Sequence, residues 1–124
     1  MNAVHFIWIA LGGALGAVAR ALVSLWIPAE YPWATLVVNV AGSLLIGFIF
    51  GLEAFHHVNP HLRILLTTGF CGALTTFSTF SYQTMALFNE GHVAGAIANI
   101  ALNLILTLLA VLAGLKLAGL TAGA

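Results

Sequence analysis

The chain has 124 residues, of which 62% are hydrophobic and 5% are charged. Soluble domains carry about 25% charged residues, and three acidic and three basic side chains cannot cover a water-facing surface. The composition therefore excludes an ordinary soluble domain and predicts an integral membrane protein whose surface faces lipid. Because the formal net charge is zero, nothing in it indicates a nucleic-acid partner.

Four apolar stretches predict four transmembrane helices, since each span needs roughly 20 apolar residues to cross the hydrocarbon core. Stretches 36–50 and 100–115 are apolar on nearly every face, unlike the alternating strands of a β-barrel. Backbone groups in lipid must be satisfied within the segment, which favours helices. We expect one all-α integral membrane domain over residues 1–124, with helices at about 4–27, 33–55, 62–88 and 93–117.

The first span contains Arg20 and ends at a loop that holds Pro28 and Pro32. No basic segment precedes this span, which argues against a cleavable signal peptide. Four spans place both termini and the second loop on one side, where Arg63 and Lys116 lie, while Arg20 belongs to the other side. This is a weak positive-inside bias, so charge alone leaves the direction of insertion open.

In the first two spans and at the start of the fourth, three pairs of glycines lie four residues apart, a spacing that lets helix backbones approach closely in lipid. We expect close helix packing at these pairs, which are Gly12 with Gly16, Gly47 with Gly51, and Gly91 with Gly95. Glycine is common in membrane helices, so the pattern does not identify which helices pack together.

A narrow polar stripe is expected on the second and on the fourth span, because residues four apart share a helical face. Each stripe has three residues: Thr35, Asn39 and Ser43 on the second span, and Asn99, Asn103 and Thr107 on the fourth. Interhelical hydrogen bonding explains a single Asn or Thr inside a membrane. Two such stripes also indicate a polar path, and the residue types leave both interpretations open.

The third span is the most unusual, because residues 67–81 contain seven hydroxyl side chains and two glycines. This composition predicts a helix break near the membrane centre, where irregular backbone is tolerated only when it is buried in protein or lines water. Carbonyls freed by such a break are able to hold a cation. Phe77 and Phe80 share a helical face, and their positive ring edges favour a small anion. The alternative is a pair of core phenylalanines among hydroxyls that bond back to their own helix.

The segment Gly69–Ser81, with the sequence GFCGALTTFSTFS, strongly resembles the third-helix signature of the Fluc (CrcB-type) fluoride channel family. The resemblance extends over the whole chain. The first-helix pattern is matched by Gly12 and Gly13 with Gly16 and Arg20. Residues 35–39 (TLVVN) resemble the second-helix pattern, and Glu90 with Gly91 resembles the entry to the fourth helix. The length of the third-helix segment makes the resemblance specific.

The resemblance implies a fluoride-selective channel that exports fluoride passively across the bacterial plasma (inner) membrane and so lowers cytoplasmic fluoride. It also implies an antiparallel, dual-topology homodimer of four-helix subunits with two pores, in agreement with the weak charge bias. A structural sodium ion is the implied cofactor, held at the dimer interface by backbone carbonyls of Gly72 and Thr75. The expected partners are therefore fluoride, the lipid bilayer and a second copy of the chain, with no nucleic acid.

By matching position, the resemblance also assigns pore residues. Arg20 and Glu90 are expected in the vestibule, where the arginine attracts anions. The Asn39 amide would donate to the ion, and the ring edges of Phe77 and Phe80 would approach it. Such preorganised donors are needed because fluoride is strongly hydrated and conduction requires binding that is favourable but escapable. The remaining expected pore residues are Ser78, Thr79, Asn99, Asn103 and Thr107.

Some positions depart from the family pattern. Ala73 follows Gly72 where the family often has a second glycine. Gln83 stands where many members have Glu, so no role of a carboxylate carries over to this chain. The stripe on the fourth span begins with Asn99 rather than with an aromatic hydroxyl or serine, although an amide still donates to an anion.

Other classes of protein remain as alternatives from the residues. A small four-helix proton-coupled multidrug exporter requires a carboxylate within a span, and none stands at mid-membrane in this sequence. A non-transporting scaffold leaves the polar stripes and the third-helix segment unexplained. An enzyme is not expected, because no nucleophile–base pair or metal-ligand set has a convincing spacing. The loop histidines His56, His57 and His61 are expected to be solvated rather than to bind a metal.

Overall fold

The computed structural model describes residues 1–123, and all regular structure within them is helical. Three spans are single helices: α1 (Ala3–Trp26), α2 (Trp33–Leu52) and α6 (Val93–Gly119). The third span is divided into α3 (Pro60–Ile64), the π-helix η1 (Leu65–Cys71), α4 (Gly72–Leu74) and α5 (Phe77–Asn89). The expectation of an all-α chain with four apolar spans is confirmed, and each observed span end lies within three residues of the expected one.

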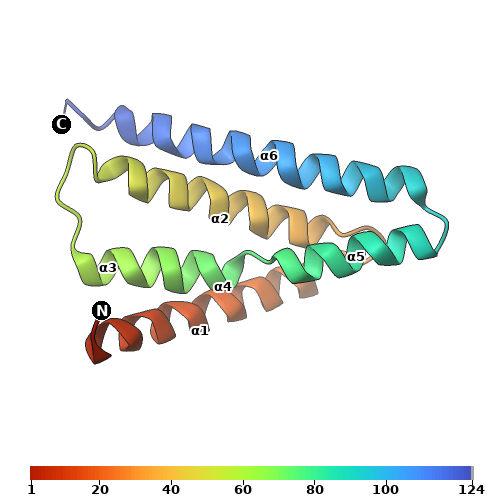
Figure 1. The fold of residues 1–124 in the computed structure, drawn as a ribbon, viewed down its shortest axis with the longest axis horizontal. Helices are drawn as coiled ribbons and strands as arrows, with labels where there is room; N and C mark the ends of the chain where they lie inside the picture. Colours follow the sequence, from red (N-terminus) through yellow and green to blue (C-terminus); the bar gives the residue numbers. More distant parts are fainter. Residues whose placement is uncertain (124) are drawn as a thin grey trace.

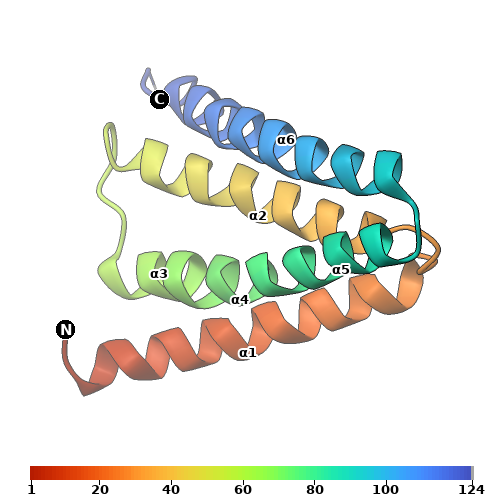
Figure 2. The ribbon, with the colours of Figure 1, turned by 45° about the vertical axis from the view of Figure 1, so that its right-hand side comes forward.

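The four spans lie side by side, with α1 along the third span, then α2, and then α6 (Figure 1). The same order is visible when the molecule is turned (Figure 2). The start of α1, the end of α6 and the α2–α3 loop lie together, which agrees with four membrane crossings. This end of the molecule is called the terminal end below, and the opposite end, with the α1–α2 and α5–α6 connections, is called the loop end.

Local sequence explains where several helices begin. Asn2 caps α1 by accepting from the backbone N–H of residues 4 and 5. Asn59 caps α3 in the same way, with Pro60 at the first helical position, where its missing N–H is harmless. Gly91 lies in the turn between α5 and α6 with φ of 84°, a conformation that favours glycine. Because an added Cβ on Gly91 would meet nothing within 4 Å, the expectation that it packs two helices is wrong.

Close packing at the other two glycine pairs is confirmed. A Cβ added at Gly12 or Gly16 of α1 would overlap with backbone carbonyl oxygens of η1. A Cβ added at Gly47 of α2 would overlap with the backbone of α6, and one added at Gly114 of α6 would overlap with the backbone of α2. Backbones approach this closely only where side chains are absent. Two glycine seams therefore join α1 to the third span and α2 to α6.

The third span breaks at Thr75 and Thr76, near the middle of Pro60–Asn89. Both residues are extended, with ψ of 154° and 122°. Thr76 is the N-cap of α5, and its hydroxyl oxygen accepts from the Thr79 N–H at 3.1 Å. The Thr75 hydroxyl donates to the Cys71 carbonyl oxygen at 2.8 Å, within the last turn before the break. The break that the composition predicts is present. Thr75 bonds to the last turn of the helix before it, and Thr76 caps the helix after it.

Nothing in the sequence predicts the π-helix η1. It directly precedes α4 and packs against α1 at Gly69, where an added Cβ would come within 2.8 Å of the Ile9 carbonyl oxygen. Such segments are rare and occur frequently at functional sites. In this molecule Thr67, Thr68 and Cys71 of η1 border the groove described below.

Replacing Gly12 by alanine is expected to destabilise the fold by about 1–3 kcal/mol, the scale of overpacking in a close-packed interior. The added methyl group would overlap with the Leu65 carbonyl oxygen and separate α1 from η1. Gly13→Ala is the matched control, because an added Cβ there meets nothing within 4 Å. Thermal unfolding of both variants in detergent measures the difference. Equal midpoints would contradict the glycine seam between α1 and η1.

Candidate functional site

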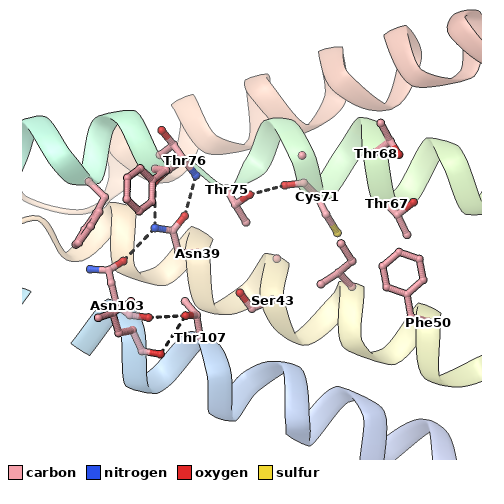
Figure 3. A pocket seen from close by; sticks show the side chains of 16 residues that line it. Asn39, Ser43, Phe50, Thr67, Thr68, Cys71, Thr75, Thr76, Asn103 and Thr107 are labelled. Carbon is pink, nitrogen blue, oxygen red and sulfur yellow. Dashed lines mark hydrogen bonds between the residues drawn. The ribbon is translucent and has the colours of Figure 1, made fainter. Parts of the chain in front are cut away.

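A groove of about 550 Å³ follows the third span on the side of α2 and α6. It passes the helix break and is bordered by residues from α2, both halves of the third span and α6 (Figure 3). Among the described residues that line it, none is charged. The lining residues are Asn39, Gly42, Ser43, Ile46, Phe50, Thr67, Thr68, Cys71, Gly72, Thr75, Thr76, Phe77, Phe80, Asn103, Leu104 and Thr107.

The Asn39 side chain bonds to both backbone groups of Thr76 at the break (Figure 3). Its Oδ1 accepts from the Thr76 N–H at 2.8 Å, and its Nδ2 donates to the Thr76 carbonyl oxygen at 3.3 Å. A further hydrogen bond from Nδ2 reaches Asn103 Oδ1 at 3.0 Å. Backbone groups inside a membrane have no water to bond with. The Asn39 amide therefore replaces the helical partners that Thr76 lost.

Hydrogen bonds continue from Asn103 along α6 and return to α5. Asn103 Nδ2 donates to the Asn99 carbonyl oxygen at 2.9 Å and to Asn99 Oδ1 at 3.1 Å. Asn99 Nδ2 donates to Thr84 Oγ1 at 2.9 Å, and the Thr84 hydroxyl donates to the Phe80 carbonyl oxygen at 2.8 Å. Asn99 is fully buried. The connected residues, called the amide chain below, are Thr76, Asn39, Asn103, Asn99 and Thr84.

The structure contains interhelical hydrogen bonds at both polar stripes. Asn39 and Asn103 form the interhelical hydrogen bond that one interpretation predicts. At the loop end of the second-span stripe, the Thr35 hydroxyl donates to Gln83 Oε1 at 2.7 Å and joins α2 to α5. Four stripe residues also border the groove, namely Asn39, Ser43, Asn103 and Thr107, whereas Thr35 and Asn99 do not. The polar path itself stays a prediction.

Phe77 and Phe80 share a face, and both border the groove. Their ring centroids are 5.5 Å apart, and the ring planes are inclined by 57°. Phe80 is buried, whereas Phe77 is 77% exposed in the single subunit. Asn39 borders the same groove as the two rings.

Arg20 lies beside the break and is not among the residues that line the groove. Its Nε donates to the Ala73 carbonyl oxygen at 3.1 Å. In a continuous helix that carbonyl would accept from the Phe77 N–H, so Arg20 satisfies a group that the break leaves free. Ser78 and Thr79 lie in the first turn of α5 and are also absent from the lining.

The break also frees the Gly72 carbonyl. In a continuous helix this group accepts from the Thr76 N–H, which here donates to Asn39. Gly72 is exposed, and an added Cβ would meet only the Thr67 carbonyl oxygen, at 3.8 Å, so its surroundings are open. Carbonyls of unwound membrane helices are suitable sodium ligands. The carbonyls of Gly72 and Thr75 fit such an ion in chemistry, but they supply only part of a coordination shell.

Glu90 lies at the loop end, outside the groove. Its side chain is 66% exposed, and its carboxylate is 4.0 Å from the His92 ring nitrogen. It borders a smaller cavity of about 190 Å³ together with Glu30 and Tyr31. The Tyr31 hydroxyl donates to the Gly95 carbonyl oxygen at 2.8 Å, and burial raises the pKa of Tyr31. Glu90 is thus placed near the expected membrane surface.

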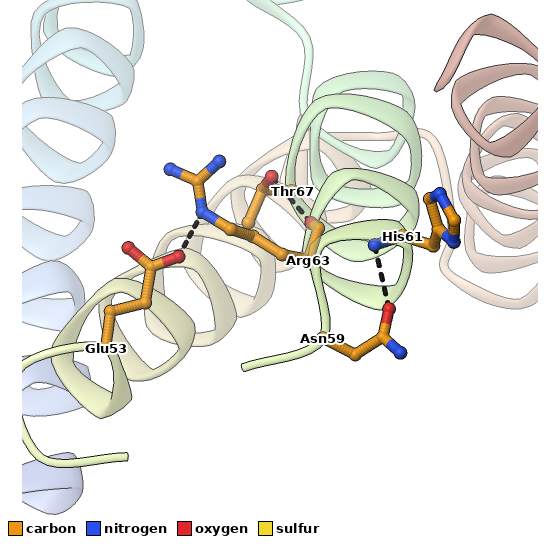
Figure 4. A network of polar contacts seen from close by, with 5 residues as sticks. All are labelled: Glu53, Asn59, His61, Arg63 and Thr67. Carbon is orange, nitrogen blue, oxygen red and sulfur yellow. Dashed lines mark hydrogen bonds and ion pairs between the residues drawn. The ribbon is translucent and has the colours of Figure 1, made fainter. Parts of the chain in front are cut away.

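At the terminal end, Arg63 forms an ion pair with Glu53 (Figure 4). The guanidinium carbon lies 5.2 Å from the centre of the Phe50 ring, a cation–π contact. Phe50 borders the groove, and the Thr67 hydroxyl donates to the Arg63 carbonyl oxygen at 2.8 Å. A charged pair that nothing in the sequence predicts therefore lies beside the terminal end of the groove.

The loop histidines form no cluster of metal ligands in the described part of the chain. His56 lies 2.9 Å from the Thr121 hydroxyl, and the His61 ring stacks on Trp8 with centroids 5.5 Å apart. Within residues 1–123, no group of three His, Cys, Asp or Glu side chains is arranged to hold a metal ion.

Sequence reasoning missed three contributors to the site: Thr76, Gln83 and Thr84. The signal for Thr84 was present, because it stands four residues after Phe80 and seven after Phe77 on one helical face. Thr76 was identifiable as a threonine N-cap once a break was placed before Phe77. The contact of Gln83 with Thr35 depends on the register between two helices, which a single sequence does not contain.

These features define a polytopic membrane protein built like a small channel or transporter, in which a broken helix borders a groove without charged side chains among its described lining residues. The chain belongs to the family described as CrcB-like protein, Camphor Resistance (CrcB), which it matches over residues 7–115. The family resemblance that the third-helix segment indicates is thereby confirmed.

Relatives of this chain carry the name fluoride-specific ion channel FluC. The protein of Hahella chejuensis is 45% identical over 123 residues, which cover 94% of this chain and 96% of the relative. That of Shewanella sp. (strain W3-18-1) is 46% identical over 113 residues, covering 88% and 91%. That of Pyrococcus horikoshii is 44% identical over 121 residues, covering 95% and 98%. The similarity therefore extends over nearly the whole of each chain.

Proposed function

We propose that this chain forms a fluoride-selective channel that exports fluoride passively across the bacterial plasma (inner) membrane and lowers cytoplasmic fluoride. The observation that carries the proposal is the groove, which passes Asn39, Phe77 and Phe80 and has no charged side chain among its described lining residues. The relatives named as fluoride-specific ion channels support it. Four helices long and apolar enough to cross a membrane support the location.

Partial charges suit the conduction of a small anion. Fluoride is strongly hydrated and enters only where donors replace its water, yet it must also leave. The Asn39 N–H groups and the phenylalanine ring edges supply partial positive charge. The ion would compete with the 3.3 Å hydrogen bond from Asn39 to the Thr76 carbonyl, the longest that this amide makes. Further donors proposed for the pore are Ser78, Thr79, Asn99, Asn103 and Thr107.

The functional unit in this proposal is an antiparallel, dual-topology homodimer with two pores. Phe77 leaves a large apolar surface uncovered at the groove, and a second subunit would cover it. Carbonyls of Gly72 and Thr75 from both subunits would complete the shell of a structural sodium ion, which one subunit supplies only in part. Arg20 and Glu90 take the vestibule positions.

Fluoride efflux from liposomes that contain the purified protein tests the function, with chloride-loaded vesicles as the comparison. We expect fast fluoride release and little chloride release, because the proposed donors suit a small, hard anion. Verified dimers that release no fluoride would contradict the proposal. Proton-coupled export of organic cations, the alternative function, would then be tested, although no carboxylate among the described residues lines the groove to carry the proton.

Phe80→Ile is expected to reduce fluoride flux by about tenfold or more, while the dimer stays intact. The substitution keeps an apolar side chain at a buried position but removes the electropositive ring edge, and each factor of ten corresponds to about 1.4 kcal/mol of lost stabilisation of the ion. The efflux assay measures the flux, and size-exclusion chromatography checks the dimer. Unchanged flux would remove this ring from the mechanism.

Asn39→Asp is expected to suppress transport. A carboxylate would place negative charge on the anion path and would face the Asn103 Oδ1 and the Thr76 carbonyl oxygen without a hydrogen to donate. Gly13→Ala, which alters an open surface position of α1, is the control in the same assay. Full fluoride release by the Asn39→Asp protein would show that the ion follows another path.

A further inference from the structure

The amide chain begins and ends on the same helix. It leaves α5 at its N-cap, Thr76, crosses to Asn39 of α2, continues through Asn103 and Asn99 of α6, and returns to α5 at Thr84. Thr84 itself is 5% exposed and does not border the groove. The hydrogen bonds of the amide chain therefore form a closed circuit through α5, α2 and α6. This circuit surrounds the first turns of α5, which carry Phe77 and Phe80.

Backbone groups set the direction of the hydrogen bonds in this circuit. The Thr76 N–H can only donate, so Asn39 Oδ1 accepts from it and Asn39 Nδ2 faces Asn103. The Asn99 carbonyl can only accept, so Asn103 Nδ2 faces Asn99 and Asn103 Oδ1 faces Asn39. The Phe80 carbonyl also can only accept, so the Thr84 hydroxyl donates to it. The lone pairs of Thr84 Oγ1 then remain free to accept from Asn99. Each amide thus has one orientation that all of its neighbours allow.

Counting donors shows how the circuit depends on Thr84. Each asparagine amide has two N–H groups. Asn39 Nδ2 has two acceptors, and so does Asn103 Nδ2. Asn99 Nδ2 is fully buried and donates to Thr84 Oγ1. Without that oxygen, the Asn99 side chain would rotate toward another acceptor. Asn103 Nδ2 would then keep the Asn99 backbone carbonyl but lose Asn99 Oδ1, and the amide that accepts from Asn39 would be held less firmly.

We propose that Thr84, acting through Asn99 and Asn103, is a positioning residue that orients the Asn39 amide toward the ion. The inference rests on the proposed function, since Thr84 lies behind the groove and would set the geometry of the ion site proposed there. Thr84 does not reach the groove, so its influence on the ion passes through the hydrogen bonds of the amide chain.

Thr84→Val tests this inference in the liposome efflux assay. Valine preserves the shape of the side chain and removes the oxygen that accepts from Asn99. We expect the fluoride concentration that gives half-maximal flux to rise about tenfold, the scale of one buried amide left without its acceptor. Thr84→Ser keeps the oxygen and is expected to restore the wild-type value.

The concentration dependence separates positioning from a merely structural role. A fold defect lowers the number of active channels and the maximal flux, but it leaves the half-maximal concentration unchanged. If Thr84→Val does not form dimers, Thr84→Ala takes its place, since it removes the hydroxyl without adding a methyl group. A half-maximal concentration equal to that of the wild type, or the same rise in Thr84→Ser, would overturn the inference and leave the channel function standing. A wild-type protein that releases no fluoride would overturn the proposed function, and this inference with it.

Discussion

A helix that breaks inside lipid must find new partners for the backbone groups that it frees, and the rest of this structure depends on how that need is met. Two neighbouring helices supply the partners. Asn39 of α2 bonds to both backbone groups of Thr76, and Arg20 of α1 bonds to the Ala73 carbonyl. Because lipid offers no replacement for a lost hydrogen-bond partner, these bonds hold the break and its neighbours in one arrangement. The polar residues around the irregular backbone therefore stabilise it by bonding to the groups that it frees.

The glycine seams explain why a groove exists beside the break. One seam brings α1 against η1, and the other brings α2 against α6, so the molecule consists of two tightly packed pairs of helices. The space between the pairs is bordered by the stripes on α2 and α6 and by the residues of the break. Polar contacts rather than close backbone packing join the pairs near the break, through Asn39 with Thr76 and Asn99 with Thr84. The groove therefore lies where the two pairs meet, beside the helix break.

Much of the fold and part of the site were predictable from residue types and spacing. Four runs of apolar residues determine four spans, since a chain with so few charges has no other stable environment. Hydroxyls and glycines around Gly72 indicated the break, and a spacing of four placed Asn39 and Asn103 on polar faces. The π-helix η1 was not predictable, because no local sequence signal marks it, and its close approach to the Ile9 carbonyl at Gly69 is a contact between two spans. The ion pair of Arg63 with Glu53 joins the second and third spans. It was not predictable, because neither segment alone determines the register between them.

The sequence by itself determined that the chain spans a membrane four times, that its third span is interrupted, and which polar residues face inward. These properties follow from local composition and helical periodicity, which act within one segment. Only the tertiary structure decided which inward-facing residues bond to one another and which border the groove. It connected Asn39 with Asn103, placed Arg20 at the break, and brought Thr84 into the amide chain. The physical reason is that a hydrogen bond requires donor and acceptor within about 3 Å, and such distances between helices are set by backbone packing at glycines far away in the sequence.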